Sequence, residues 1–168
     1  MLVKNIIKIK TKTTLHMAFP NIFTDEVSAA VISRIANLKP GTLPDWGKMN
    51  SAQMLAHCSV TYEMVYESKH PKPNFLMRFI LKMFIKKTVT GDAPYKRNSQ
   101  TAPAFVIKDD RNFDKEKSRL ISYIIKTKDL GENHFDGKES LSFGVLNKDE
   151  WNTMFYKHLD HHLTQFGV

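Results

Sequence analysis

Three histidines near the C-terminus are the residues of this sequence whose type and spacing best suit chemistry. The closing segment "WNTMFYKHLDHHLTQFGV" contains His158, His161 and His162, and imidazole can bind a metal, hydrogen-bond inside a core or lie in water. At about 100° per helical residue, His158 and His162 fall at the centre of the apolar stripe that includes Trp151 and Phe155, whereas His161 falls at its margin. The central pair is therefore expected to point into the core.

The spacing of this pair favours a metal site. Two imidazoles at positions i and i+4 project from adjacent turns of one helix face, close enough to bind a single ion. A polar ring in an apolar stripe needs a partner, and a metal satisfies both rings at once. The competing interpretation is that His158 and His162 hydrogen-bond to core hydroxyls or to buried water.

A metal site needs a further ligand from another helix, and His57 is the best candidate. Met54 and Thr61 share its helix face, so its ring is expected to point inward. Gln53 and Thr61 on this face, and Gln165 in the stripe of the last helix, are candidates to support the ligands or to face a substrate.

The remaining histidines and the single cysteine are weaker candidates. His16, His70 and His134 fall in the N-terminal segment or in predicted loops, so we expect them to lie in water. Cys58 is displaced by about 100° from His57 on the same predicted helix, which favours a buried thiol over a metal-bound thiolate.

The elements that would position these residues are helices, because helical periodicity runs through most of the chain and no set of alternating strands stands out. Several helix starts are marked by capping residues: Thr24, Asn50 with Gln53, and Asn147 with Glu150. The predicted helices cover about residues 25–38, 50–68, 74–87, 114–128 and 147–166. The pattern predicts an all-α protein.

The third of these helices, "NFLMRFILKMFIKK", is apolar nearly all round. Its cations Arg78, Lys82 and Lys86 repeat at i, i+4 and i+8, which predicts one basic ridge. We expect the helix to be buried among the others with this ridge in water; a dimer face and a membrane-surface helix are the alternatives. The long connection 88–112 includes "TAPAFVI", expected as an extended segment packed across the helices or as a lid over a site.

Length and composition limit the organisation and the partners. The 168 residues suit one domain, 20–168, preceded by a basic extension, 1–19. Half of the net charge of +8 lies in residues 1–16, and no motif for nucleic-acid binding accompanies it. The chain has one cysteine and lacks both the apolar core of a signal peptide and a run long enough to cross a bilayer. We therefore expect a cytoplasmic protein.

The segments "WGKMNSAQMLAHCSVTYEMV" and "EWNTMFYKHLDHHLTQFG" resemble the DinB/YfiT-like metal-binding superfamily, specifically one of its families of unknown function. The resemblance covers about residues 20–168. It implies an up-down four-helix bundle with a long crossover loop and a possible short extra helix, in which His57, His158 and His162 hold a divalent metal. Leu159 stands where the zinc proteases have a glutamate, so protease chemistry lacks its general base.

Two functions follow from these residues. The first is a metal-dependent transferase or hydrolase that uses a small thiol or water as nucleophile on a small-molecule substrate, because three neutral imidazoles leave open positions on a metal. Zinc, nickel, iron and manganese all suit such ligands. The alternative is a non-enzymatic binding or self-association module with a structural or vestigial metal site. In that case the apolar helix would form the interface of a homodimer. The sequence identifies no catalytic residue.

Overall fold

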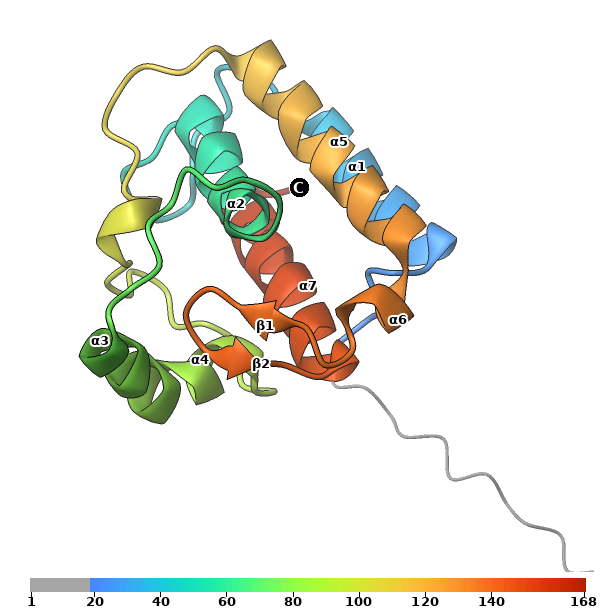
Figure 1. Ribbon diagram of the computed structural model, residues 1–168. Helices are drawn as coiled ribbons and strands as arrows, with labels where there is room; N and C mark the ends of the chain where they lie inside the picture. The colour runs from blue at the N-terminus through green and yellow to red at the C-terminus, as the bar shows by residue number, and fades with distance from the viewer. Residues whose placement is uncertain (1–18) are drawn as a thin grey trace, which may run out of the picture.

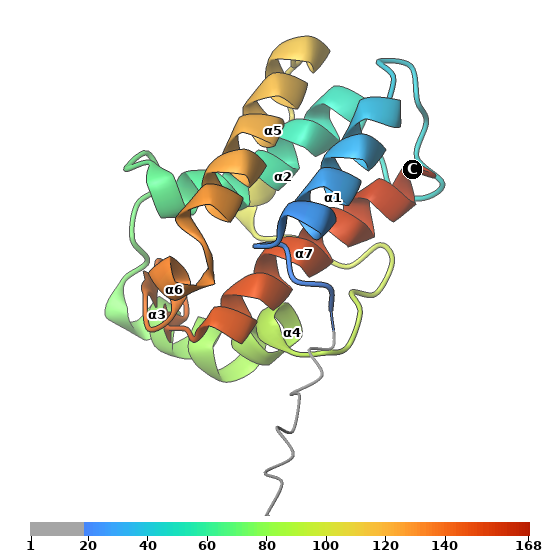
Figure 2. The same ribbon diagram turned by 90° about the vertical axis from the view of Figure 1, so that its right-hand side faces the viewer.

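The computed structural model describes residues 19–168, and this part of the chain is mostly helical, as the sequence predicts. Its long helices are α1 (Asp25–Asn37), α2 (Ser51–Tyr66), α5 (Phe113–Leu130) and α7 (Lys148–Gln165). Helix α2 packs against α5 and α7, and α1 packs against the same two helices, as Figures 1 and 2 show. Apart from Phe19, the basic extension predicted for residues 1–19 lies outside the described residues.

The starts of these helices follow the capping chemistry read from the sequence. The side chain of Thr24 accepts a hydrogen bond from the Val27 amide and begins α1. Asn50 and Gln53 form a complete capping box at α2, in which each side chain accepts from the other residue's backbone amide. The last helix, α7, begins with the same reciprocal pair, here Asn147 and Glu150. The two helices that contain the candidate ligands therefore begin at positions fixed by local sequence.

Helix α2 lies at the centre of the fold. Nearly every residue between Ser51 and Glu63 is buried, because α5 and α7 cover it from different sides. Tyr62 on this helix stacks between Phe155 and Tyr123, with ring centroids 5.0 Å and 5.7 Å away. Burial of this kind is the dominant stabilising contribution to a helical core, and it places the middle of α2 inside the protein.

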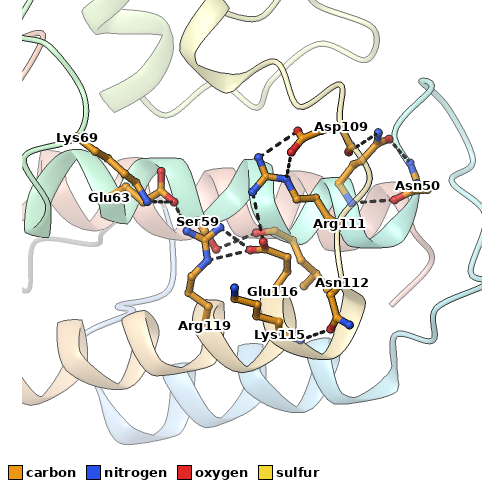
Figure 3. Close-up of polar contacts among 12 residues, drawn as sticks. Asn50, Ser59, Glu63, Lys69, Asp109, Arg111, Asn112, Lys115, Glu116 and Arg119 are labelled. Atoms are coloured by element: carbon orange, nitrogen blue, oxygen red, sulfur yellow. Dashed lines mark hydrogen bonds and ion pairs between the residues drawn. The ribbon is translucent and has the colours of Figure 1, made fainter.

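A buried ionic network fastens α2 to α5 (Figure 3). Arg119 donates hydrogen bonds to both Glu63 and Glu116, two carboxylates that are almost fully buried. Burial alone would raise the pKa of Glu63, but hydrogen bonds from Lys69, His70 and Arg119 lower it below its ordinary value. His70 lies 2.7 Å from Glu63 and is only partly exposed, so the expectation that it would lie in water is wrong.

The segment after α2 differs most from the sequence prediction. It forms α3 (Phe75–Ile80), a π-helical turn (Leu81–Ile85) and α4 (Lys86–Thr90), at the edge of the molecule away from α1 and α5 (Figures 1 and 2). The prediction that this helix is buried with its basic ridge in water is wrong, because it contains no buried residue. Among the described residues, no helix is both long and apolar enough to span a bilayer.

The cause of this inversion is that two of the basic residues, Arg78 and Lys86, face the protein. Arg78 pairs with Glu139 at 2.5 Å, and Lys86 pairs with Glu150 of α7 at 2.8 Å. On a regular helix, residues eight apart differ in direction by about 80°. The π turn between Arg78 and Lys86 contains one extra residue, which reduces this difference in direction. Both cations can therefore reach the protein, and the apolar side chains point outward.

The two long connections contain short elements that the sequence prediction missed. The segment "TAPAFVI" is expected to be extended or to form a lid, but it contains the 3₁₀ helix η2 (Pro103–Phe105), which packs against α2. Between α5 and α7 lie α6 (Glu132–Phe135) and an antiparallel pair, β1 (Glu139–Ser140) and β2 (Gly144–Val145). Strands this short give too little alternation to be recognised by pattern.

Candidate metal centre

His57 of α2 and His158 and His162 of α7 meet inside the protein. The ring centroids of His57 lie 4.9 Å from His158 and 4.5 Å from His162, and those of the α7 pair lie 4.9 Å apart. The Nε2 atoms of His57 and His158 are 3.0 Å apart. One nitrogen from each ring lies within 4.8 Å of the other two, so the three residues could hold a metal ion. His57 and His162 are buried, and His158 is partly buried.

The outer nitrogen of each ring already has a partner. Nδ1 of His57 lies 2.8 Å from the Phe105 carbonyl oxygen of η2, and Nδ1 of His162 lies 2.7 Å from the side-chain oxygen of Gln165. Both oxygens only accept, so both Nδ1 atoms donate and carry the proton of a neutral ring. The remaining Nε2 atoms of these two rings then present lone pairs.

The third ring, His158, has a partner of a different kind. Its Nδ1 lies 2.9 Å from the Thr61 hydroxyl on α2, and a hydroxyl can either donate or accept. Partners of this type on the outer nitrogen fix ring orientation at metal sites in proteins. All three imidazoles are therefore oriented by groups outside the cluster.

The environment keeps the three rings neutral. Burial lowers the pKa of His57, and it lowers the pKa of His162 to about 3, with the neighbouring His57 adding to the effect. Burial and the other imidazoles hold the pKa of His158 well below its ordinary value. A neutral imidazole is the form that binds a metal, so no proton has to leave these rings at neutral pH before a metal can bind.

Aromatic side chains lie beside the cluster and beside the neighbouring His161. The ring of Phe105 lies 5.5 Å from His57 and 5.8 Å from His158, and Tyr95 lies 6.4 Å from His158. Trp46, in the loop before α2, contacts His161 at 5.7 Å. His161 itself is only partly buried and is not one of the three clustered rings, in agreement with its predicted position at the margin of the stripe.

The residues predicted to support the ligands separate into two groups. Thr61 and Gln165 both contact ligand candidates, as described above. Gln53 does not, because its side chain accepts a hydrogen bond from the Asn50 amide in the capping box and donates to the Asp109 carbonyl. Cys58 is fully buried away from the rings, and burial raises the pKa of its thiol.

Three other groups at the site could not be predicted from the sequence. The Phe105 carbonyl and the Trp46 carbonyl, which accepts from the Gln165 amide, are backbone atoms that any residue type could supply. Lys157 is buried and donates to three carbonyl oxygens, those of Thr88, Gly91 and Ala93. Burial lowers the pKa of Lys157 to about 8. Its neighbour along α7 is His158, so this contact anchors the start of the crossover beside the cluster.

Comparison with known protein families finds a match over most of the chain. Residues 22–167 match the model of the family described as protein of unknown function (DUF1569). Comparison with curated proteins and comparison with solved structures gave no match. The match covers almost the whole of the described chain, including the three clustered histidines and the helices that position them. The chain therefore belongs to the DUF1569 family of proteins of unknown function.

Proposed function

We propose that this protein binds a divalent transition metal through Nε2 of His57, His158 and His162, with zinc, nickel, iron and manganese as the candidates. The observation that supports this proposal is the orientation of the rings. Each outer nitrogen has a partner outside the cluster, while the inner nitrogens converge only on one another. Lone pairs that converge in a buried site repel each other unless a cation or a proton lies between them.

The distances suit a metal. Metal–nitrogen bonds of about 2.0–2.1 Å place two ligand nitrogens roughly 3.3 Å apart in a tetrahedral site. The Nε2 atoms of His57 and His158 are 3.0 Å apart, so a small adjustment of either ring would accommodate the ion. Nitrogen-only ligands favour transition metals such as zinc, nickel and iron over the oxygen-seeking calcium and magnesium.

We propose further that the protein is a DinB-like enzyme, a transferase or hydrolase that activates a small thiol or water. Three protein ligands leave open positions, and a bound metal of this kind lowers the pKa of a water or thiol. The residues of the chain hold and orient the rings, while Phe105 and Tyr95 limit the access of bulk water. The arrangement of α1, α2, α5 and α7, with a long crossover between α2 and α5, supports the proposed four-helix bundle.

A non-enzymatic role is the second candidate. The group of metal-binding residues found in the described chain contains no carboxylate beside its histidines, and Leu159 follows His158 where a protease would have its general base. A metal held only by these rings would then fasten α7 to α2, and the protein would bind a partner without transforming it.

Metal analysis tests the proposal. The purified full chain, measured by inductively coupled plasma mass spectrometry, is expected to contain close to one transition metal per chain. The variants His57→Ala, His158→Ala and His162→Ala should lose it, whereas His161→Ala, which removes the neighbouring ring outside the cluster, should retain it. Native protein that contains no metal, and gains none from added zinc, nickel, iron or manganese, would refute the metal site.

Activity separates the two candidates once metal binding is established. Metal-loaded protein is screened for thiol transfer and for hydrolysis of small esters and amides, with His162→Ala as the inactive control. Turnover that requires the metal supports the enzyme. Metal-loaded protein whose unfolding temperature depends on the metal, but which turns over none of these substrates, supports the structural role.

A further inference from the structure

The outer face of the α3–α4 segment is a large apolar surface that the proposed metal chemistry does not use. Phe75 is 87% exposed and Phe84 is 70% exposed. The whole set, which we call the apolar face, lies within one helical segment of eleven residues: Phe75, Leu76, Met77, Phe79, Ile80, Met83, Phe84 and Ile85. Contiguous exposed apolar surface of this kind marks a site of interaction with another protein or with a membrane.

The fold holds this face outward by specific contacts. Asn74 caps the start of α3, and the ion pairs of Arg78 with Glu139 and of Lys86 with Glu150 attach the opposite side of the segment to the protein. Helix α4 also packs directly against α7. The helix is therefore docked through its polar side, and turning the apolar face inward would break both ion pairs.

The charges beside the apolar face indicate the chemistry of what covers it. Lys82 and Lys87 belong to the same segment, are exposed, and form no ion pair with any residue that the structure describes. The chain as a whole has a net charge of +8. An anionic surface would complement these charges, because long lysine side chains extend past apolar neighbours to reach anionic groups.

A second copy of the chain fits this face less well. In a two-fold symmetric dimer the same patch lies on both sides of the interface. The lysines of one copy would then approach those of the other, in a complex of two chains that each have a net charge of +8. The face is also a single outward helix at the edge of the molecule (Figure 2), the form of helices that lie in the plane of a membrane interface.

We propose that the apolar face docks on a membrane surface that contains anionic lipids. The exposed rings of Phe75, Phe79 and Phe84 enter the boundary between head groups and acyl chains, and Lys82 and Lys87 contact the lipid phosphates. The bulk of the protein, including the histidine cluster on α2 and α7, stays outside the bilayer. This attachment does not depend on whether the histidines bind a metal.

Vesicle sedimentation with the full chain tests the proposal. The chain is expected to sediment with vesicles of phosphatidylcholine and phosphatidylglycerol, and much less with phosphatidylcholine alone. The variant Phe75→Ser/Phe79→Ser/Phe84→Ser should bind at least ten times more weakly. The variant Lys82→Glu/Lys87→Glu should lose about fivefold or more for each lysine, and added salt should weaken the native chain in the same direction.

Matched controls distinguish the face from exposed apolar residues in general. Leu43 is 82% exposed in the loop before α2, and Ile125 is exposed on α5; Leu43→Ser and Ile125→Ser should bind vesicles like the native chain. Circular dichroism and thermal unfolding of the triple variant establish that it folds, which is expected because it changes only exposed rings.

Three results would each contradict the proposal. Undiminished vesicle binding by the folded triple variant would place the attachment elsewhere in the chain. Light scattering that shows a dimer in solution, dissociated by the same three substitutions, would assign the face to a second copy. Equal binding to neutral and anionic vesicles would remove the assigned role of Lys82 and Lys87.

Discussion

Replacing Thr61 by valine tests whether an orienting hydroxyl determines metal affinity. Valine has nearly the shape of threonine and removes only the oxygen, which lies 2.9 Å from Nδ1 of His158. Thr61 is 7% exposed, so water cannot easily replace the lost partner. The ring of His158 would keep its packing and lose the contact that fixes its orientation.

The expected magnitude follows from this geometry. A buried polar atom left without a partner costs about 1–3 kcal/mol, which corresponds to roughly a 5–150-fold change in an equilibrium constant. Loss of an orienting partner at protein metal sites typically weakens metal binding by about 10–100-fold. We therefore expect Thr61→Val to bind zinc about 10–100 times more weakly. The metal-free protein should also unfold at a lower temperature, because Nδ1 of His158 loses its hydrogen bond there too.

The assay is competition for zinc with a chromophoric chelator. Thr153→Val is the matched control, because Thr153 is also a threonine that is 7% exposed and lies on α7 without a hydrogen bond to any of the three clustered rings. It should bind zinc like the native chain. Equal affinity of Thr61→Val and Thr153→Val, with both proteins folded, would refute the reasoning that Thr61 orients a ligand.

Three further predictions concern the groups around the rings. Gly47 has φ +84°, and an added Cβ would lie 2.6 Å from the amide nitrogen of Gln165, the residue that contacts His162. Gly47→Ala should therefore lower both thermal stability and zinc affinity. Gly41→Ala is the control, because a Cβ there meets no atom within 4 Å, and it should change neither. Lys157→Met leaves three carbonyl oxygens without their donor and should cost about 2–4 kcal/mol in urea unfolding; an unchanged midpoint would contradict this. Burial lowers the pKa of His162 to about 3 in the folded chain, from an ordinary value of 6.5. Between these values the unfolded chain binds more protons, so metal-free protein should lose stability as pH falls. Thermal scans of His162→Gln should show a weaker pH dependence, and the part that remains comes from His57 and His158.

The candidate site could be predicted from sequence to the extent that helix geometry determines it. The angular count places His158 and His162 on the core-facing stripe and His161 at its margin, and the structure has all three in those positions. Local capping signals locate the starts of both helices. Counting angles also places Gln53 on the face of His57, but the same glutamine completes the capping box of α2, and this local use of its side chain determines where it points.

The apolar segment could not be placed from sequence because periodicity identifies a polar side without showing what that side faces. A basic ridge usually lies in water, and that rule predicted the burial of the other side. Here Glu139 and Glu150, which follow the ridge by about sixty residues, attract Arg78 and Lys86 inward. The sequence of the segment also contains no signal for the inserted residue of the π turn that aligns the two cations.

The hydrogen bonds of His57 and His158 can be satisfied both with and without a cation. Nδ1 of His57 donates to the Phe105 carbonyl, so its Nε2 can only accept. The 3.0 Å contact between the Nε2 atoms therefore requires His158 to donate there, and its Nδ1 must then accept from the Thr61 hydroxyl. When a metal occupies the centre, His158 has to carry its proton on Nδ1 instead, and the same hydroxyl can rotate to accept it. A carbonyl at this position could serve only the second state, and an amide N–H only the first. A hydroxyl beside His158, with fixed acceptors beside the other two rings, is therefore compatible with both the metal-free and the proposed metal-bound state.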